Sequence, residues 1–286
     1  MDGEPETTPL RRLGAALAKA AACLVMGVFA LMTVYPILWL VMNSAKPTRE
    51  FQVSPLGWPR SPTLSNYAGA WRIGEFDKLI VNSFLYTIGA TAGIIVLSVL
   101  AGFAFAKIKS RATKPVYNLF VIGILLTLQS LLIPLFLEMN LLGIYDTRLA
   151  VFVVYIGSGL PIGIYLSTEY IKGIPTSLVE SARIDGAGYL RIFRRIILPM
   201  SAPVATTLAI LNTTSIWNEF ALINILVTRT ELKSLPLGIY RFSGSLSSDY
   251  GKQFAALAMG MLPMLAFYLV FHKRITEGVS AGAVKG

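Results

Sequence analysis

The residues whose types and spacing could do chemistry gather in one segment, 177–186, and they suit recognition more than catalysis. His272 is the only histidine and Cys23 the only cysteine of the 286 residues. Paired-histidine and thiolate metal sites are therefore excluded, and a Ser-His-Asp triad is disfavoured. The segment mixes charged with small residues: Glu180, Ser181, Ala182, Arg183, Asp185 and Gly186. A helix with a small-residue face can be approached closely by another protein, and its charges can set the register of that contact.

The segment sits within 172–199, which reads as two short helices joined by a glycine turn. The spacing of Ser177 and Glu180 predicts a capping box at the start of the first helix. This helix is expected to run to Asp185 and to end at Gly186, because glycine tolerates the left-handed conformation that a tight turn requires.

A second helix is expected from Tyr189 through Ile197, with its basic residues near the inner lipid headgroups. These are Arg191, Arg194 and Arg195. Two interpretations of the first helix stay open on physical grounds. It is either a recognition helix in the groove of a partner protein or an amphipathic helix that rests on the membrane surface.

The elements that must position this loop are long and apolar. The chain is 55% hydrophobic and only 14% charged, whereas a soluble domain carries roughly 25% charged residues. Six segments have about the 20 apolar residues that a bilayer-crossing helix needs. They are 20–42, 80–106, 116–137, 149–168, 202–227 and 254–271. Since these segments lack the alternation of barrel strands, we expect an all-α polytopic membrane protein.

Lysine and arginine predict the orientation of these spans. With both termini in the cytoplasm, 15 of the 25 basic residues lie on the inner side, most clearly in the short loop 107–114. Residues 1–19 and 274–286 are then cytoplasmic tails that flank a transmembrane domain at 20–273. The net charge of +10 is attributed to these basic loops, and no nucleic acid partner is expected.

Two kinds of residue should shape the packing of the spans. Gly89 and Gly93 form a GxxxG pattern, which predicts a close-packed face for another helix. Pro134, Pro161 and Pro263 are expected to kink or interrupt their helices.

Glu219 is the one residue that places an ionised side chain inside a predicted span. Acids within a membrane mark cavities or paired sites, but Glu219 lies 17 residues beyond Ala202, roughly 25 Å along a helix and near the outer headgroups. Cavity lining and interface structure both stay open. Asn212 and Asn218 suit hydroxyl-rich ligands, and Trp217 could stack on a sugar or belong to the interfacial aromatic belt.

The chain resembles a known family over nearly its whole length. Residues 180–188 read E-S-A-R-I-D-G-A-G and residues 196–199 read I-I-L-P. This pattern resembles the "EAA…G…I-x-L-P" loop of ABC importer permeases, in the form found in carbohydrate importers of the maltose-transporter MalG type. Further similar segments follow in order: P-I-L-W at 36–39, K-P at 46–47, P-T-L-S-N-Y at 62–67, W-N-E-F at 217–220, L-P-L-G at 235–238 and E-G-V-S-A-G-A-V-K-G at 277–286. Ser181 stands where alanine is usual.

The resemblance implies the type I ABC importer permease fold and a role as a transmembrane subunit that forms half of a carbohydrate path. Residues 180–186 would dock in a cleft of a separate ATPase, with Gly186 as a pivot. The tail residues Ser280, Ala281, Gly282 and Ala283 would lie against the same ATPase. Its partners would be an ATPase dimer, a second permease and an extracytoplasmic solute-binding protein, in the cytoplasmic membrane of a prokaryote.

The resemblance also implies that ATP and Mg²⁺ belong to the partner. The chain has no G-x-x-x-x-G-K-[ST] phosphate loop, so no cofactor and no enzymatic activity are expected in it. The residues Asn212, Trp217, Asn218 and Glu219 would lie along the substrate path.

Three other functions were weighed. A permease for glycerol phosphate or another polyol-like solute is the nearest alternative. A single-chain secondary transporter would carry internal repeats and midplane ionisable residues, and neither is clear here. A membrane enzyme would need paired carboxylates or a histidine site, which the chain lacks.

Overall fold

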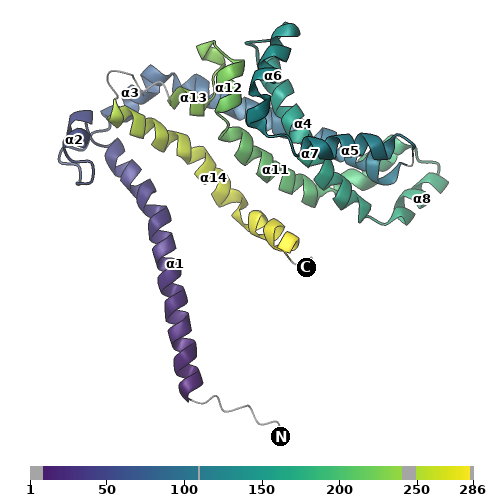
Figure 1. Cartoon of the computed structure of the whole chain (residues 1–286), viewed down its shortest axis with the longest axis horizontal. Helices are drawn as coiled ribbons and strands as arrows, with labels where there is room; N and C mark the ends of the chain where they lie inside the picture. Colours follow the sequence, from purple (N-terminus) through teal and green to yellow (C-terminus); the bar gives the residue numbers. More distant parts are fainter. Residues whose placement is uncertain (1–8, 109, 240–248, 284–286) are drawn as a thin grey trace. The chain divides into compact units, whose positions relative to one another are not determined.

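The computed structural model describes residues 9–108, 110–239 and 249–283, and within these ranges it contains helices and no strand (Figure 1). The chain divides into two compact units, which we describe separately. The first unit holds residues 1–69 and 242–258, and the second holds 70–241 and 259–286. Parts of the predicted tails, 1–8 and 284–286, lie outside the described ranges.

The first unit is built from the end of a long apolar helix and the short helices that follow it. Its helices are α1 (Pro9–Ser44), α2 (Thr48–Val53) and the beginnings of α3 (Ser65–Gly74) and α14 (Tyr250–Ala283). Rings pack edge to face where these meet, with Trp39 5.2 Å from Phe254. The side-chain amide of Asn66 donates to the carbonyls of Ser44 and Lys46 at 2.8 and 2.7 Å. These bonds hold the loop after α1 against the start of α3.

The second unit is organised by two long helices, α4 (Phe76–Lys107) and α7 (Arg148–Lys172), which pack along each other and against α11 (Ala202–Trp217). Glycines let α4 and α7 approach closely. A Cβ atom added at Gly89 would lie 2.6 Å from the Phe152 ring, and one at Gly93 would lie 2.7 Å from Ile156. The predicted close-packed GxxxG face is therefore confirmed, with α7 as its partner.

Two segments predicted as single helices are broken. Residues 116–137 divide into α5 (Thr113–Gly123) and α6 (Leu128–Leu141), whose axes differ by 107°. Residues 202–227 divide into α11 and α12 (Ala221–Leu226), separated by residues 218–220. The first break follows Gly123. The helix restarts after Thr127, and threonine is a residue type that favours helix starts.

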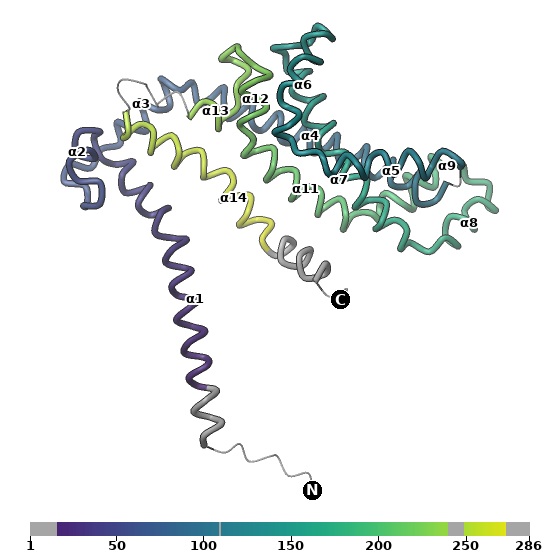
Figure 2. Tube along the Cα trace, viewed as in Figure 1, coloured from purple at the N-terminus to yellow at the C-terminus, as the bar shows by residue number. Residues whose placement is uncertain are grey.

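The prolines are expected either to kink or to interrupt their helices, and they do not interrupt them. Pro134 lies inside α6, Pro161 inside α7 and Pro263 inside α14. The remaining elements are short: α8 (Thr176–Ile184), α9 (Tyr189–Ile192), the π-helix η1 (Phe193–Ile197), α10 (Leu198–Met200), the 3₁₀-helix η2 (Thr230–Leu232) and α13 (Leu235–Ile239). The path of the chain through them is traced in Figure 2.

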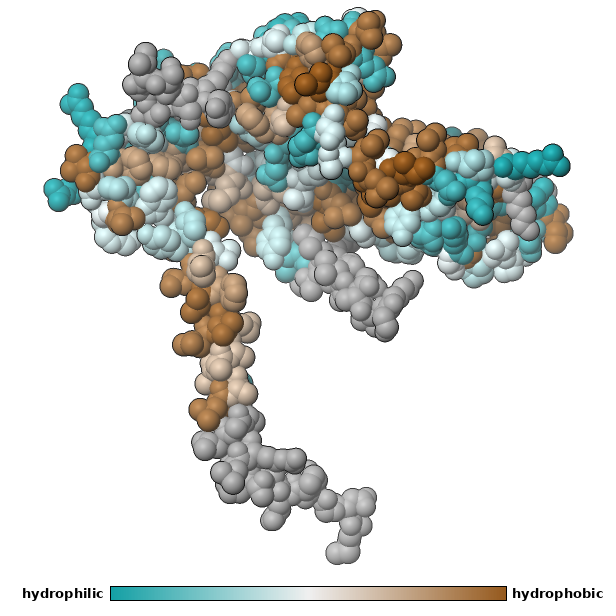
Figure 3. Space-filling model, viewed as in Figure 1, coloured by the Kyte–Doolittle hydropathy of each residue, from teal (hydrophilic) through white to brown (hydrophobic). Residues whose placement is uncertain are grey.

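In the part of the chain that the structure describes, four helices are long and apolar enough to cross a membrane, and the number rises to six if each bent pair counts as one span. The four are Ala16–Ser44, Phe76–Lys107, Arg148–Lys172 and Tyr250–His272. The bent pairs are Thr113–Gly123 with Leu128–Leu141, and Tyr189–Met200 with Ala202–Trp217. The side chains of Ala16–Ser44 are exposed over most of their length and form a largely apolar surface in Figure 3. Such a helix needs lipid or protein around it.

Candidate functional site

The segment predicted to be a recognition helix forms α8, and its end has the geometry of a Schellman motif. Gly186 adopts a left-handed φ of 76°. The Gly186 amide donates to the Arg183 carbonyl at 3.0 Å, and the Ala187 amide donates to the Ala182 carbonyl at 2.9 Å. These two bonds satisfy carbonyls that a helix end would otherwise leave free. The predicted stop at Gly186 is confirmed.

The start of α8 differs from the expectation. Pro175 is the N-cap residue and no side chain caps the helix, so the predicted capping box between Ser177 and Glu180 is wrong. Pro175, whose ring restricts φ and which has a φ of −55° and a ψ of 128°, takes the N-cap position two residues earlier than expected. Ser177 therefore lies inside the first turn, where its hydroxyl cannot take the N-cap position.

The inner face of α8 is held by a hydrophobic cluster at the ends of α4 and α7. Val179 is buried together with Ile174, Ile192 and Phe193. Phe103 of α4 packs its ring 5.9 Å from that of Phe193. Ala182 and Ala187, on either side of the turn, are half-buried against the same cluster. The helix is therefore seated on α4 and η1.

The outer face of α8 exposes most of the predicted coupling residues. Its exposed residues are Glu180, Ser181, Arg183, Ile184 and Asp185. Ile184, a large apolar residue between the charged Arg183 and Asp185, has 86% of its surface exposed. The guanidinium of Arg183 lies 5.1 Å from the Tyr189 ring centre, so the turn is also bridged by a cation–π contact.

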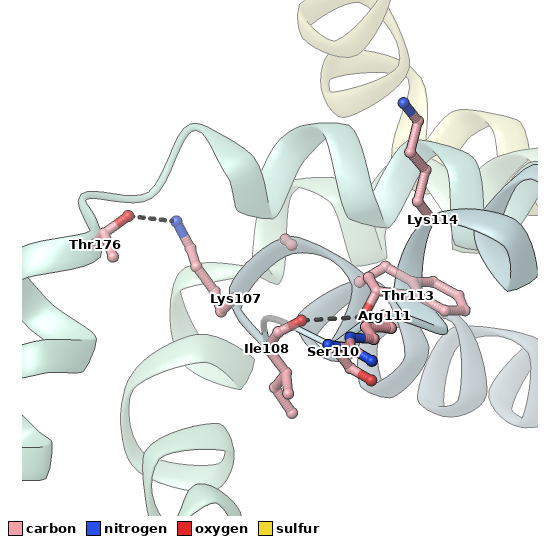
Figure 4. A pocket seen from close by; sticks show the side chains of 9 residues that line it. Lys107, Ile108, Ser110, Arg111, Thr113, Lys114 and Thr176 are labelled. Carbon is pink, nitrogen blue, oxygen red and sulfur yellow. Dashed lines mark hydrogen bonds between the residues drawn. The ribbon is translucent and has the colours of Figure 1, made fainter.

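Lys107, at the end of α4, fixes the connection from α7 to α8. Its ammonium donates to the Ile174 carbonyl at 2.5 Å and lies 3.4 Å from both the Lys172 carbonyl and the Thr176 hydroxyl. Figure 4 shows Lys107 reaching toward Thr176. A cation that bonds terminal carbonyls is favourable at a helix C-terminus. From the sequence, Lys107 is expected only in a basic loop, although its position directly after a long apolar span is a signal for this role.

The second helix of the loop contains a π-helical turn, η1, between α9 and α10. Arg191, Arg194 and Arg195 are exposed on it, while Ile192 and Ile197 are buried. The predicted division into a basic side and an apolar side is present. A π-helical turn inserts an extra residue and re-aims the side chains that follow.

The four residues proposed for the substrate path lie around the end of α11. Asn212 and Trp217 are buried, with 7% and 5% of their surface exposed. The Asn212 amide donates to its own helix at Leu208, and the Trp217 ring packs edge to face with Phe84 at 5.0 Å. Asn218 is exposed and donates to the Thr214 carbonyl. In this arrangement Trp217 presents no free ring face, and the path assignment stays a prediction.

Glu219 has a structural task at the break between α11 and α12. Its carboxylate accepts the backbone amides of Leu222 and Ile223 at 2.7 and 3.1 Å, which starts α12. It also accepts the hydroxyl of Tyr155 on α7 at 2.9 Å. Tyr155 is not among the predicted site residues, because nothing in the sequence relates it to Glu219.

A second polar cluster joins the loop after α6 to the loop after α12. One carboxylate oxygen of Asp146 accepts the amides of Thr228 and Arg229 at 2.9 and 3.1 Å, and the other lies 3.2 Å from the Arg229 guanidinium. Partial burial opposes ionisation of Asp146, but these donors outweigh it and lower the pKa of its carboxyl. Asp146 and Arg229 are not among the predicted site residues.

The tail residues Ser280, Ala281, Gly282 and Ala283 fall within the last turns of α14, and their side chains lie outside the described part. No group of three or more histidine, cysteine or acidic side chains that could hold a metal ion occurs among the described residues.

Comparison with known proteins shows the family of the chain. Residues 94–276 match the family described as binding-protein-dependent transport system inner membrane component. The ABC transporter permease protein ORF2 of Caldicellulosiruptor sp. (strain Rt8B.4) is 34% identical over 91% of this chain and 95% of its own length. The starch degradation products transport system permease protein AmyC of Thermoanaerobacterium thermosulfurigenes is 31% identical over 90% of this chain and 94% of its own.

The fold is also that of a solved transporter chain. A bacterial ABC transporter involved in the import of the acidic polysaccharide alginate contains a chain that superposes with a TM-score of 0.79, over 94% of this chain and 99% of that one, at 21% identity. This similarity shows the fold, and the family match covers most of the chain. The chain belongs to the family of binding-protein-dependent transport system inner membrane components, the permease subunits of ABC transporters.

Proposed function

We propose that this chain imports carbohydrate as one of two permease subunits of an ATP-driven transporter. Support for a sugar comes from AmyC, whose name gives starch degradation products as its cargo. The polar residues around the end of α11 are neutral amides and one tightly bonded carboxylate, which suits an uncharged, hydroxyl-rich solute better than an ion.

The observation that carries the proposal is the exposed outer face of α8. The helix packs on a buried cluster and exposes Ile184 and several charged residues. Such a helix can bind in a groove of another protein. We propose that Glu180, Ser181, Ala182, Arg183, Asp185 and Gly186 dock in a cleft of a separate ATPase. Movement of that ATPase would then be transmitted through α8 to α4 and α7.

The remaining assembly follows from the same role. The partners are an ATPase dimer, which binds ATP and Mg²⁺, a second permease and an extracytoplasmic solute-binding protein. Both termini lie in the cytoplasm, and residues 280–283 contact the ATPase. The chain itself catalyses no reaction. Asn212, Trp217, Asn218 and Glu219 border the path, with access to Trp217 requiring that it move away from Phe84.

The proposal is tested by measuring, in one preparation, the uptake of oligosaccharide and the amount of ATPase that co-purifies with the chain. The chain is co-expressed with its ATPase and second permease and reconstituted into vesicles, and ATP-dependent entry of labelled malto-oligosaccharide is measured in the presence of the binding protein. Ile184→Ser removes the exposed apolar contact of α8. We expect on the order of tenfold less co-purified ATPase, as for a central interface residue, and a parallel loss of uptake.

Leu141→Ser is the matched control, because Leu141 is a similarly exposed apolar residue, at the end of α6. It should leave both measurements near the unmodified values. Normal ATPase recovery in the Ile184→Ser variant contradicts docking through α8. Uptake of glycerol phosphate without uptake of any oligosaccharide contradicts the carbohydrate assignment.

A further inference from the structure

A basic pocket of about 640 Å³ opens where α4 ends and α5 begins (Figure 4). The described residues that line it include the cationic side chains of Lys107, Arg111 and Lys114 and the hydroxyls of Ser110, Thr113 and Thr176. None of these described lining residues carries a carboxylate. A pocket with this lining attracts an anion that can accept several hydrogen bonds.

The three charges are available in different ways. Lys107 is held by the Ile174 carbonyl and by Thr176, so it contributes a fixed positive charge. Arg111 and Lys114 are exposed, and their side chains make no hydrogen bond or ion pair with any residue that the structure describes. In Figure 4 the Lys114 side chain, on α5, points in another direction than that of Lys107 at the end of α4. Arg111 and Lys114 are both long enough to turn onto a bound group.

The acid on the neighbouring helix does not cancel this charge. Glu169 of α7 is 2.7 Å from the ammonium of Lys172 and also accepts the hydroxyl of Tyr117 at 2.9 Å. Its charge is therefore already balanced by a lysine outside the pocket. Glu169 of α7 therefore does not neutralise the positive charge of the pocket.

An apolar face continues from the pocket along α5. Val116, Leu119 and Ile122 are 41%, 69% and 57% exposed, and their spacing of three residues places them on one side of the helix. This face begins within one turn of Lys114. A ligand with an anionic head and an apolar tail would match both surfaces at once.

We propose that this pocket binds the phosphate group of an anionic phospholipid, with the acyl chains along Val116, Leu119 and Ile122. The inference rests on the proposed function only for placing this end of α4 at the inner leaflet. A guanidinium can hold phosphate oxygens through two parallel hydrogen bonds, and lysine adds a point charge. Basic pockets at the cytoplasmic ends of spans are suited to such headgroups. Inorganic phosphate shares the head chemistry but makes no use of the apolar face.

Native mass spectrometry of the full-length chain in detergent measures the binding directly. The chain is titrated with phosphatidylglycerol, with phosphatidylcholine of the same acyl chains, and with inorganic phosphate. We expect retention of phosphatidylglycerol over phosphatidylcholine, and Arg111→Gln with Lys114→Gln should weaken phosphatidylglycerol binding by on the order of tenfold. Arg111→Lys with Lys114→Arg should restore it. Arg49→Gln with Arg60→Gln, which removes two exposed arginines from the first unit, should leave it unchanged.

Three results would overturn the proposal. One is an unchanged lipid preference in the Arg111→Gln, Lys114→Gln variant. Another is inorganic phosphate that displaces phosphatidylglycerol at equal concentration, which would assign the pocket to the free anion. The third is a loss of co-purified ATPase in that variant with lipid preference intact, which would make the pocket a protein contact. Oligosaccharide uptake, measured separately, decides the proposed function without affecting the lipid result.

Discussion

The hydroxyl of Tyr155 on α7 donates a 2.9 Å hydrogen bond to the carboxylate of Glu219, which at the same time accepts two backbone amides at the start of α12. One carboxylate therefore joins α7 to the break that follows α11. Tyr155 is buried, so its hydroxyl needs this partner. The break between α11 and α12 is therefore stabilised by a hydrogen bond to a residue that is distant in the sequence.

Tyr155→Phe should destabilise the chain by about 1–2 kcal/mol, because it removes one hydrogen bond to a charged group and leaves the ring in place. Thermal unfolding in detergent, followed by tryptophan fluorescence, measures the change. Tyr165→Phe, on the same helix but half-exposed and without a hydrogen bond to the described residues, should leave the midpoint unchanged. Equal effects of the two changes would contradict a specific role for the Tyr155 bond.

The Asp146 cluster predicts a pH-dependent contribution to stability. The pKa of this carboxyl is lower in the folded chain than in the unfolded one, so its contribution is complete above the unfolded value of about 4 and is lost as the pH falls through the folded value. Asp146→Asn should lower the unfolding midpoint at pH 7, and the difference from the unmodified chain should shrink as the pH falls below 4.

Glu231→Gln is the control for this prediction. It removes a carboxylate 3.9 Å from the same Arg229 guanidinium, but that carboxylate accepts none of the backbone amides held by Asp146. The pH dependence should persist in the Glu231→Gln chain. A constant difference between the Asp146→Asn and unmodified chains from pH 7 to pH 3 would refute the assignment.

The contact between α4 and α7 predicts opposite effects of alanine at two glycines. At Gly102 a Cβ would lie 2.8 Å from Ser167 Cβ and 3.0 Å from backbone atoms of Ser167 and Thr168. Backbone atoms cannot move aside as the end of a flexible side chain can. Gly102→Ala should therefore lower the free energy of unfolding by about 1–3 kcal/mol. At Gly157 nothing lies within 4 Å, and alanine there should gain up to about 1 kcal/mol of helix propensity. Unfolding midpoints that move in the same direction would contradict this packing.

Much of the fold could be predicted because it depends on local signals. Hydropathy alone located the long helices α1, α4, α7 and α14. The glycines at 89 and 93 predicted a close helix contact, and Gly186 predicted the end of α8. In each case the residue type limits its own backbone or its immediate neighbours, so the sequence around it is sufficient.

The breaks in the third and fifth spans could not be predicted in the same way. Residues 124–127 are as apolar as the helices on either side, and hydropathy does not distinguish a bend from a straight helix. At 218–220 the break depends on Glu219, whose hydroxyl partner Tyr155 is 64 residues away. The charge of Glu219 inside an apolar segment suggests a residue of the substrate path. Its role as the acceptor of backbone amides at the start of α12 becomes visible only with the break.

Gly186 and Gly188 provide the sharpest test of how α8 is held for its partner. Gly186 has a φ of 76°, where serine costs roughly 1–2 kcal/mol, whereas Gly188 has a φ of −70° at the N-cap of α9, where serine is favoured. Nothing lies within 4 Å of a Cβ at either position, so backbone conformation is the only difference. Gly186→Ser should reduce ATPase co-purification and uptake on the order of tenfold. Gly188→Ser should preserve both, and Gly186→Asn should recover much of the loss because asparagine tolerates this conformation. Equal loss in the two serine variants would show that the left-handed turn is not what positions α8.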